Sequence, residues 1–107
     1  MPAYEPISIP DFVKEKYQHE IKTIKKYLAE AFPEHSITFG YSVELFSIGF
    51  TLAHYTGQNV IFFKSMFLEN LDSPLDNWLK SSGIKEFVAM NTETTLVIDN
   101  DGKLLLR

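Results

Sequence analysis

The chain contains no cysteine, no long hydrophobic run and no basic N-terminal segment. The lack of cysteine excludes disulfide scaffolds, thiolate metal sites and cysteine catalysis, and it favours a reducing compartment. A membrane-spanning helix needs roughly 20 consecutive apolar residues, and no segment approaches that length. Residues 1–12 hold three prolines and no lysine or arginine, which is not the pattern of a signal peptide. We therefore expect a cytoplasmic protein without a membrane segment.

Motifs that carry catalysis or bind cofactors are also missing. The five glycines stand singly, so there is no glycine-rich loop to cradle a phosphate. No serine lies in a Gly-x-Ser-x-Gly elbow, and no acidic pair shares one helical face. The three histidines, His19, His35 and His54, include no His-x-x-x-His pair, which favours three surface histidines over a metal site. We predict no catalytic residues, no metal and no cofactor.

The composition that remains is globular. The chain has 107 residues, of which 45% are hydrophobic, and its net charge of −4 is too small to favour disorder. A chain of this mass buries roughly two-thirds of its unfolded surface when it folds, which supports one hydrophobic core without disulfide bonds or a structural metal. We therefore expect a single domain over residues 1–107.

The first third of the chain predicts an arm followed by a helix. Three prolines restrict residues 1–10, which favours an extended arm. Apolar residues then recur every three or four positions, which predicts one long amphipathic helix over about 11–31. Phe32–Pro33 ends it, because a residue before proline avoids α-helical geometry.

The pattern then changes to the alternation of strands. Apolar residues occupy odd positions from 37 to 45 and even positions from 46 to 52. One regular strand cannot keep both sets on one face, so a bulge or a reversal lies near Glu44–Phe46. We favour a reversal between two strands. A third strand, over 60–64, follows a turn at Tyr55–Gln58.

A second helix begins at Ser73–Pro74, with Ser73 as the capping residue, and covers about 74–81. Gly83 is a suitable stop, and residues 66–71 are compatible with one more helical turn. Three further strands are expected at residues 87–90, 95–98 and 103–107.

The last two of these strands form a hairpin around Asp99–Gly102, in which Gly102 takes a positive φ. The expected order is α-β-β-β-α-β-β-β. This order predicts an α+β two-layer sandwich with a predominantly antiparallel sheet, one long N-terminal helix and one short middle helix.

Charge is divided along the chain. Five of the ten lysines and arginines lie between positions 14 and 26, whereas residues 66–101 hold seven acids and two lysines. Charge runs are usually solvated surface, with i,i+4 pairs along a helix. The sharper interpretation is that the acidic segment binds a basic protein partner, with Glu69, Asp72 and Asp76 as candidates.

The basic segment supports a separate interpretation, in which an anionic partner binds Lys22, Lys25 and Lys26. Nucleic acid is the less favoured such partner, because the net charge is negative and the helix has no arginine to contact bases.

Two segments, Ile61–Phe63 and Leu104–Leu106, place apolar residues on both faces of a strand. In a two-layer domain one sheet face ordinarily meets water, so something must cover the second face. We expect a homodimer, with Leu104, Leu105 and Leu106 as interface candidates.

These observations predict a non-catalytic, acidic protein-binding module. By analogy with other small acidic proteins, it acts on a basic partner as an inhibitor, immunity or antitoxin-type protein. Two alternatives stay open. One is a small enzyme or metal-dependent protein whose histidines and acids converge in space. The other is a nucleic-acid accessory protein that uses the lysine stripe of the first helix.

Overall fold

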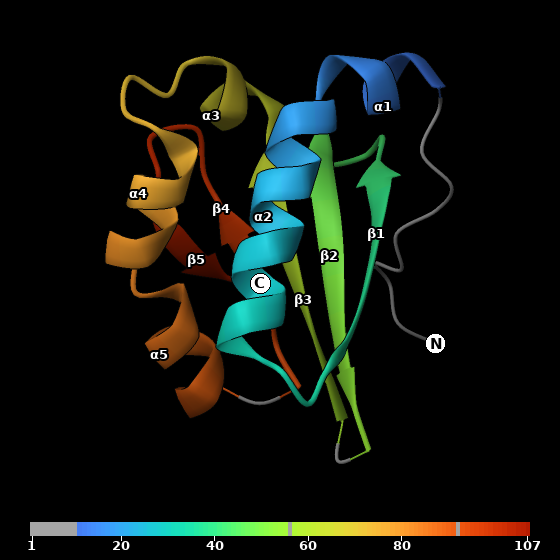
Figure 1. Ribbon diagram of the computed structural model, residues 1–107, viewed down its shortest axis with the longest axis vertical. Helices are drawn as coiled ribbons and strands as arrows, with labels where there is room; N and C mark the ends of the chain where they lie inside the picture. Colours follow the sequence, from blue (N-terminus) through green and yellow to red (C-terminus); the bar gives the residue numbers. More distant parts are fainter. Residues whose placement is uncertain (1–10, 56, 92) are drawn as a thin grey trace.

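A computed structural model describes residues 11–55, 57–91 and 93–107. Its helices and strands confirm the α+β class (Figure 1). In chain order they are α1 (Asp11–Lys16), α2 (Gln18–Ala31), β1 (Ser36–Ser42), β2 (Ser47–His54), β3 (Gly57–Lys64), α3 (Ser65–Glu69), α4 (Leu75–Ser81), α5 (Ile84–Met90), β4 (Thr95–Ile98) and β5 (Leu104–Leu106). The extended arm predicted over 1–10 lies outside the described residues.

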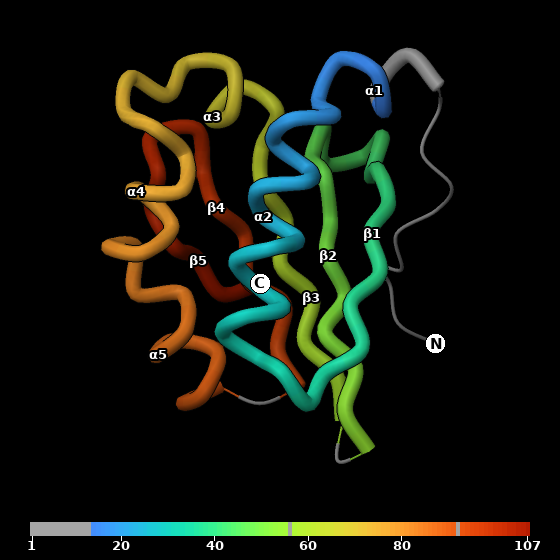
Figure 2. Tube along the Cα trace, in the orientation of Figure 1, coloured from blue at the N-terminus to red at the C-terminus, as the bar shows by residue number. Residues whose placement is uncertain are grey.

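The five strands form one sheet in the order β1-β2-β3-β4-β5. Three of the four neighbouring pairs are antiparallel, as predicted, and the β3–β4 pair is parallel. A parallel pair needs a crossover connection, which α3, α4 and α5 supply. Figure 2 shows α2 crossing in front of the sheet, with α4 and α5 beside it on the same side.

The main core lies between the helices and this face of the sheet. Alternate residues of β2 point into it, because Ile48, Phe50 and Leu52 are all fully buried. They meet the buried stripe of α2, which consists of Ile21, Ile24 and Leu28. The three- and four-residue spacing of that stripe is the helical period that the sequence predicts.

The opposite face of the sheet is also apolar near its centre. A second buried cluster there consists of Leu45, Val60, Phe62 and Val97. Phe62 is fully buried, and its neighbours Ile61 and Phe63 are fully buried in the main core. The continuous apolar run of β3 therefore reflects a strand that is buried on both faces.

The predicted reversal near Glu44–Phe46 is confirmed. β1 and β2 pair antiparallel up to Ser42 and Ser47, with residues 43–46 as the turn. The Ser42 Oγ atom accepts a 3.2 Å hydrogen bond from the Leu45 amide, and the Ser47 hydroxyl donates a 2.8 Å bond to the Leu45 carbonyl. Two serines that flank the turn therefore close it.

The single helix predicted over 11–31 is wrong in one respect. Helical geometry is interrupted at Tyr17, whose φ and ψ are −110° and 21°. Tyr17 is only 6% exposed, and its hydroxyl donates a hydrogen bond to Glu69. The break accompanies a contact with a residue far along the chain. The spacing of apolar residues over 11–31 therefore did not reveal it.

The strand predicted over 87–90 is also wrong, because these residues belong to α5. Ile84 and Val88 are four residues apart and both are buried, so they share one helical face. Gly83, with a φ of 82°, ends α4 as expected and also precedes α5 directly. Within the described residues, the chain after β3 therefore contains two strands rather than three.

The start of the middle helix differs in detail. Pro74, not Ser73, occupies the N-cap position of α4, and no side chain caps the helix. The prediction for the hairpin is confirmed, since Gly102 has a φ of 86°. None of the helices in the described part of the chain is long and apolar enough to cross a membrane.

Two candidate binding grooves

A groove of about 280 Å³ opens where α3, the α3–α4 loop, α4 and the β4–β5 turn meet. We call it the acidic groove, since its charged side chains are both carboxylates. It is lined by Phe67, Asn70, Leu71, Asp72, Ser73, Trp78, Asn100 and Asp101.

Two aromatic rings form part of its wall. The ring centroids of Phe67 and Trp78 are 4.6 Å apart, with the planes at 57°. Gly102 packs against both, because a Cβ atom built on it would lie 3.4 Å from Phe67 Cε1 and 3.5 Å from Trp78 Nε1. The positive φ of this glycine thus brings the β4–β5 turn onto the ring pair.

The two carboxylates reach the groove from distant segments. Asp72 lies in the α3–α4 loop, and Asp101 in the β4–β5 turn. One oxygen of Asp101 is 3.7 Å from the Lys103 ammonium, but both side chains are more than half exposed, at 58% and 73%. Exposed ion pairs of this kind contribute little to stability. The contact with Lys103 therefore does not prevent the Asp101 carboxylate from binding a cationic group of a partner.

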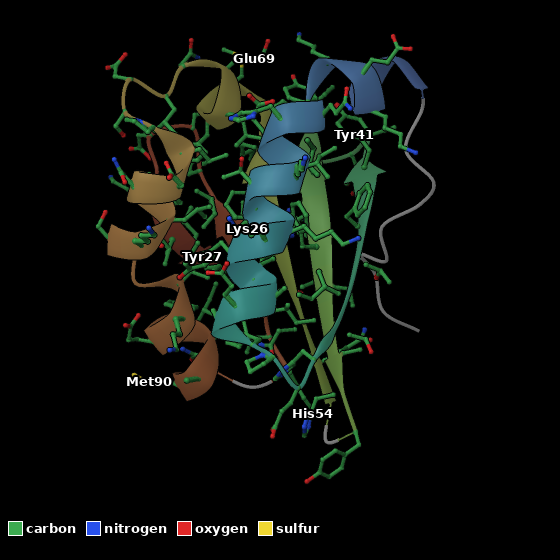
Figure 3. The ribbon with its side chains drawn as sticks, viewed as in Figure 1. Lys26, Tyr27, Tyr41, His54, Glu69 and Met90 are labelled. Atoms are coloured by element: carbon green, nitrogen blue, oxygen red, sulfur yellow. The ribbon has the colours of Figure 1, made fainter. Side chains whose placement is uncertain are left out.

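A larger groove, of about 500 Å³, runs between α2 and α4. We call it the lysine groove. It is lined by His19, Lys22, Thr23, Lys26, Tyr27, Glu30, Pro74, Leu75, Asp76 and Lys80. Lys26 and Tyr27 project from α2 in Figure 3.

Tyr27 forms a fixed part of this groove. Burial raises the pKa of its phenol, and the Glu86 carboxylate adds to the effect. The Lys85 backbone amide and the Ser82 hydroxyl interact with the phenol and act in the opposite direction. These groups belong to the α4–α5 junction, so Tyr27 joins α2 to that junction.

A polar cluster outside both grooves links the helices to each other. The Glu69 carboxylate accepts a 3.0 Å hydrogen bond from the Tyr17 hydroxyl and lies 2.8 Å from the Lys16 ammonium. Hydrogen bonds from Lys16 and then from Tyr17 hold the pKa of Glu69 below its ordinary value. The pKa of Tyr17 is raised, first by burial and then by Glu69.

The structure separates the acidic residues that the sequence grouped together. Asp72 lines the acidic groove, Asp76 lines the lysine groove, and Glu69 is engaged with α1 and α2. Two further residues of the acidic groove, Trp78 and Asp101, were not among the candidates from the sequence. The Asp-Asn-Asp-Gly hairpin was the available signal, because a glycine there can bring a turn onto an aromatic ring.

The lysine candidates also divide. Lys22 and Lys26 line the lysine groove together with Lys80, which the sequence analysis did not single out. Lys25 lies instead over the Phe39 ring, 5.5 Å from its centroid. The three lysines therefore do not all line one groove.

Two of the three histidines converge. The ring centroids of His35 and His54 are 4.9 Å apart, and one oxygen of Glu34 lies 3.9 Å from His54 Nε2. His35 and His54 are partly buried, so the interpretation as surface histidines holds for His19 alone. Across residues 11–55, 57–91 and 93–107, no three histidine or acidic side chains are grouped as a metal ion requires. His54 lies at the opposite end of the molecule from Glu69 (Figure 3).

Comparison of the chain with protein-family models, with curated proteins and with solved structures finds no match.

Proposed function

We propose that the protein is a non-catalytic binding module that takes a basic segment of a protein partner into the acidic groove. The observation that supports this proposal is the placement of Asp72 and Asp101 around the Phe67–Trp78 ring pair. A lysine or arginine side chain can lay its charged end over an indole ring and bond to carboxylates at the same time.

The lining of the groove suits recognition more than a reaction. Its carboxylates and the carbonyl groups of Asn70 and Asn100 are hydrogen-bond acceptors, which complement the five donors of a guanidinium group. The rings offer an apolar surface for the aliphatic stem of the same side chain. Binding is expected to weaken with salt, because the carboxylates are close to solvent.

Trp78 is the only tryptophan of the chain, so its fluorescence reports directly on the groove. We expect hexa-arginine, added at low ionic strength, to change this fluorescence in a saturable way, and hexa-glutamate to have no effect. The double variant Asp72→Asn/Asp101→Asn is expected to bind hexa-arginine at least about tenfold more weakly, since two charge-assisted contacts are lost.

Asp76→Asn is the matched control. Asp76 comes from the same acidic segment and carries the same charge, but it lines the other groove. The proposal is wrong if Asp76→Asn weakens hexa-arginine binding as much as the double variant does. It is also wrong if the wild type shows no saturable change at low salt.

A homodimer through β5 is a second proposal about partners. β5 is at the end of the strand order, and its Leu105 and Leu106 are 45% and 56% exposed. Among the described residues β5 has a neighbouring strand on one side only, and pairing of its other edge with a second copy would cover part of both leucines. The proposal of a dimer rests on this strand alone, since Ile61–Phe63 is buried within one chain.

We also propose a cytoplasmic location, which fits the lack of cysteine.

A further inference from the structure

Three lysines from two helices line the lysine groove. Lys22 and Lys26 are one turn apart on α2, and Lys80 is in the last turn of α4 on the other side of the groove. The packing of these two helices therefore creates a concentration of positive charge that is not evident along the chain, where Lys80 lies in the acidic segment.

These lysines lack carboxylate partners among the described residues. None of the three ammonium groups lies within 4.0 Å of a carboxylate there, although Glu30 and Asp76 line the same groove. Lys16, by contrast, is 2.8 Å from Glu69. The three lysines of the groove outnumber its two carboxylates, Glu30 and Asp76, so its lining carries an excess of one positive charge, which favours anions.

The remaining wall of the groove is concave and partly apolar. Tyr27, Pro74 and Leu75 supply this surface; Leu75 belongs to the main core, and Tyr27 packs against that core. The volume of about 500 Å³ is in the range of small-molecule sites, which combine an apolar lining with a few polar groups.

We propose that the lysine groove binds the phosphate group of a small molecule, with Lys22, Lys26 and Lys80 as its ligands. A phosphate carries more charge than a single carboxylate, so it can interact with three ammonium groups at once. The rest of the molecule then lies against Tyr27 and Leu75. This proposal is independent of the acidic groove, because the two grooves share no lining residue.

The test is a titration of the full chain with inorganic pyrophosphate at constant ionic strength, followed by backbone amide chemical shifts. We expect saturable shifts that are concentrated in residues 19–30 and 74–80. Lys22→Gln and Lys26→Gln are each expected to weaken binding at least about fivefold, since each removes one unit charge next to the anion.

Lys25→Gln is the matched control, because Lys25 is adjacent in sequence and lies over the Phe39 ring instead. It is expected to leave pyrophosphate binding unchanged. Asp76→Asn is expected to strengthen that binding, since it removes a negative charge from the groove. The same variant is expected to leave hexa-arginine binding unchanged. The two measurements therefore test the two proposals independently.

Two results would overturn the proposal. One is the lack of saturable shifts in a wild type whose amide spectrum is that of a folded protein. The other is equal weakening by Lys25→Gln and Lys26→Gln, which would indicate general attraction to the helix surface. The amide spectrum of each variant also shows whether it is folded, so a lost site is distinguished from a lost fold.

Discussion

The Tyr17 hydroxyl donates a 3.0 Å hydrogen bond to the Glu69 carboxylate and thereby joins the break between α1 and α2 to α3. The Lys16 ammonium completes the cluster, 2.8 Å from the same carboxylate. Because the folded pKa of Glu69 is lowered, its contribution to stability is present above the unfolded pKa and is lost as the pH falls through the folded pKa. The pKa of Lys16 is raised, so its contribution is lost as the pH rises through the folded value.

Glu69→Gln is therefore expected to destabilise the protein near neutral pH and to matter less in acid. Urea unfolding at about pH 7 and about pH 3 brackets the ordinary pKa of a glutamate. We expect the difference in unfolding free energy between wild type and variant to shrink at the lower pH. Glu15→Gln, on the exposed surface of α1, is the control and should show little difference at either pH. An equal loss for Glu69→Gln at both pH values would contradict the role of ionisation.

Phe46 has a φ of 49°, in the left-handed region that bulky L-residues rarely adopt, and its side chain is 66% exposed. Left-handed geometry costs an L-residue roughly 1–2 kcal/mol, and asparagine tolerates it better. Phe46→Asn is expected to raise the melting temperature by a few degrees. Val43→Asn, at a 61% exposed position of the same turn without a positive φ, is the control and should not raise it. A lower melting temperature for Phe46→Asn would show that the ring makes a stabilising contact.

Phe62 tests the apolar cluster on the sheet face opposite the helices. Its side chain is fully buried there, so Phe62→Ala removes a large apolar group from a packed site. We expect a loss of about 3–5 kcal/mol in unfolding free energy, measured with urea. Met90→Ala, at an 83% exposed position, should change it by less than about 0.5 kcal/mol. Similar small losses for both variants would mean that this face of β3 is not a packed core.

Leu105→Lys tests the proposed homodimer. A lysine on an edge strand opposes pairing with another strand, and Leu105 is 45% exposed in the single chain. The variant is therefore expected to stay folded and to shift from dimer to monomer in sedimentation equilibrium. Met90→Lys, on α5, should leave the mass unchanged. A wild type that sediments as a monomer at high micromolar concentration would exclude the dimer.

Some features followed from local sequence. The phase change of apolar residues near Glu44–Phe46 predicted the reversal between β1 and β2, because the period of a strand depends only on adjacent residues. The Asp99–Gly102 hairpin was predictable for the same reason, since its geometry depends on a glycine within it.

Other features were ambiguous locally. Residues 87–90 form a short apolar run that suits a strand as well as a helix, and packing of Ile84 and Val88 into the core decided in favour of α5. The break at Tyr17 likewise accompanies a hydrogen bond to a residue on another helix.

By itself the sequence determined the fold class and the division of charge between a basic and an acidic segment. Only the tertiary structure decided which charges act together. It placed Lys80 in the same groove as Lys22 and Asp101 in the same groove as Asp72, and it left Lys25 outside the lysine groove. The physical reason is that these neighbours depend on the rotation of α2 against α4 and on the crossover from β3 to β4. Both are set by burial of apolar faces over the whole chain, which no local pattern encodes.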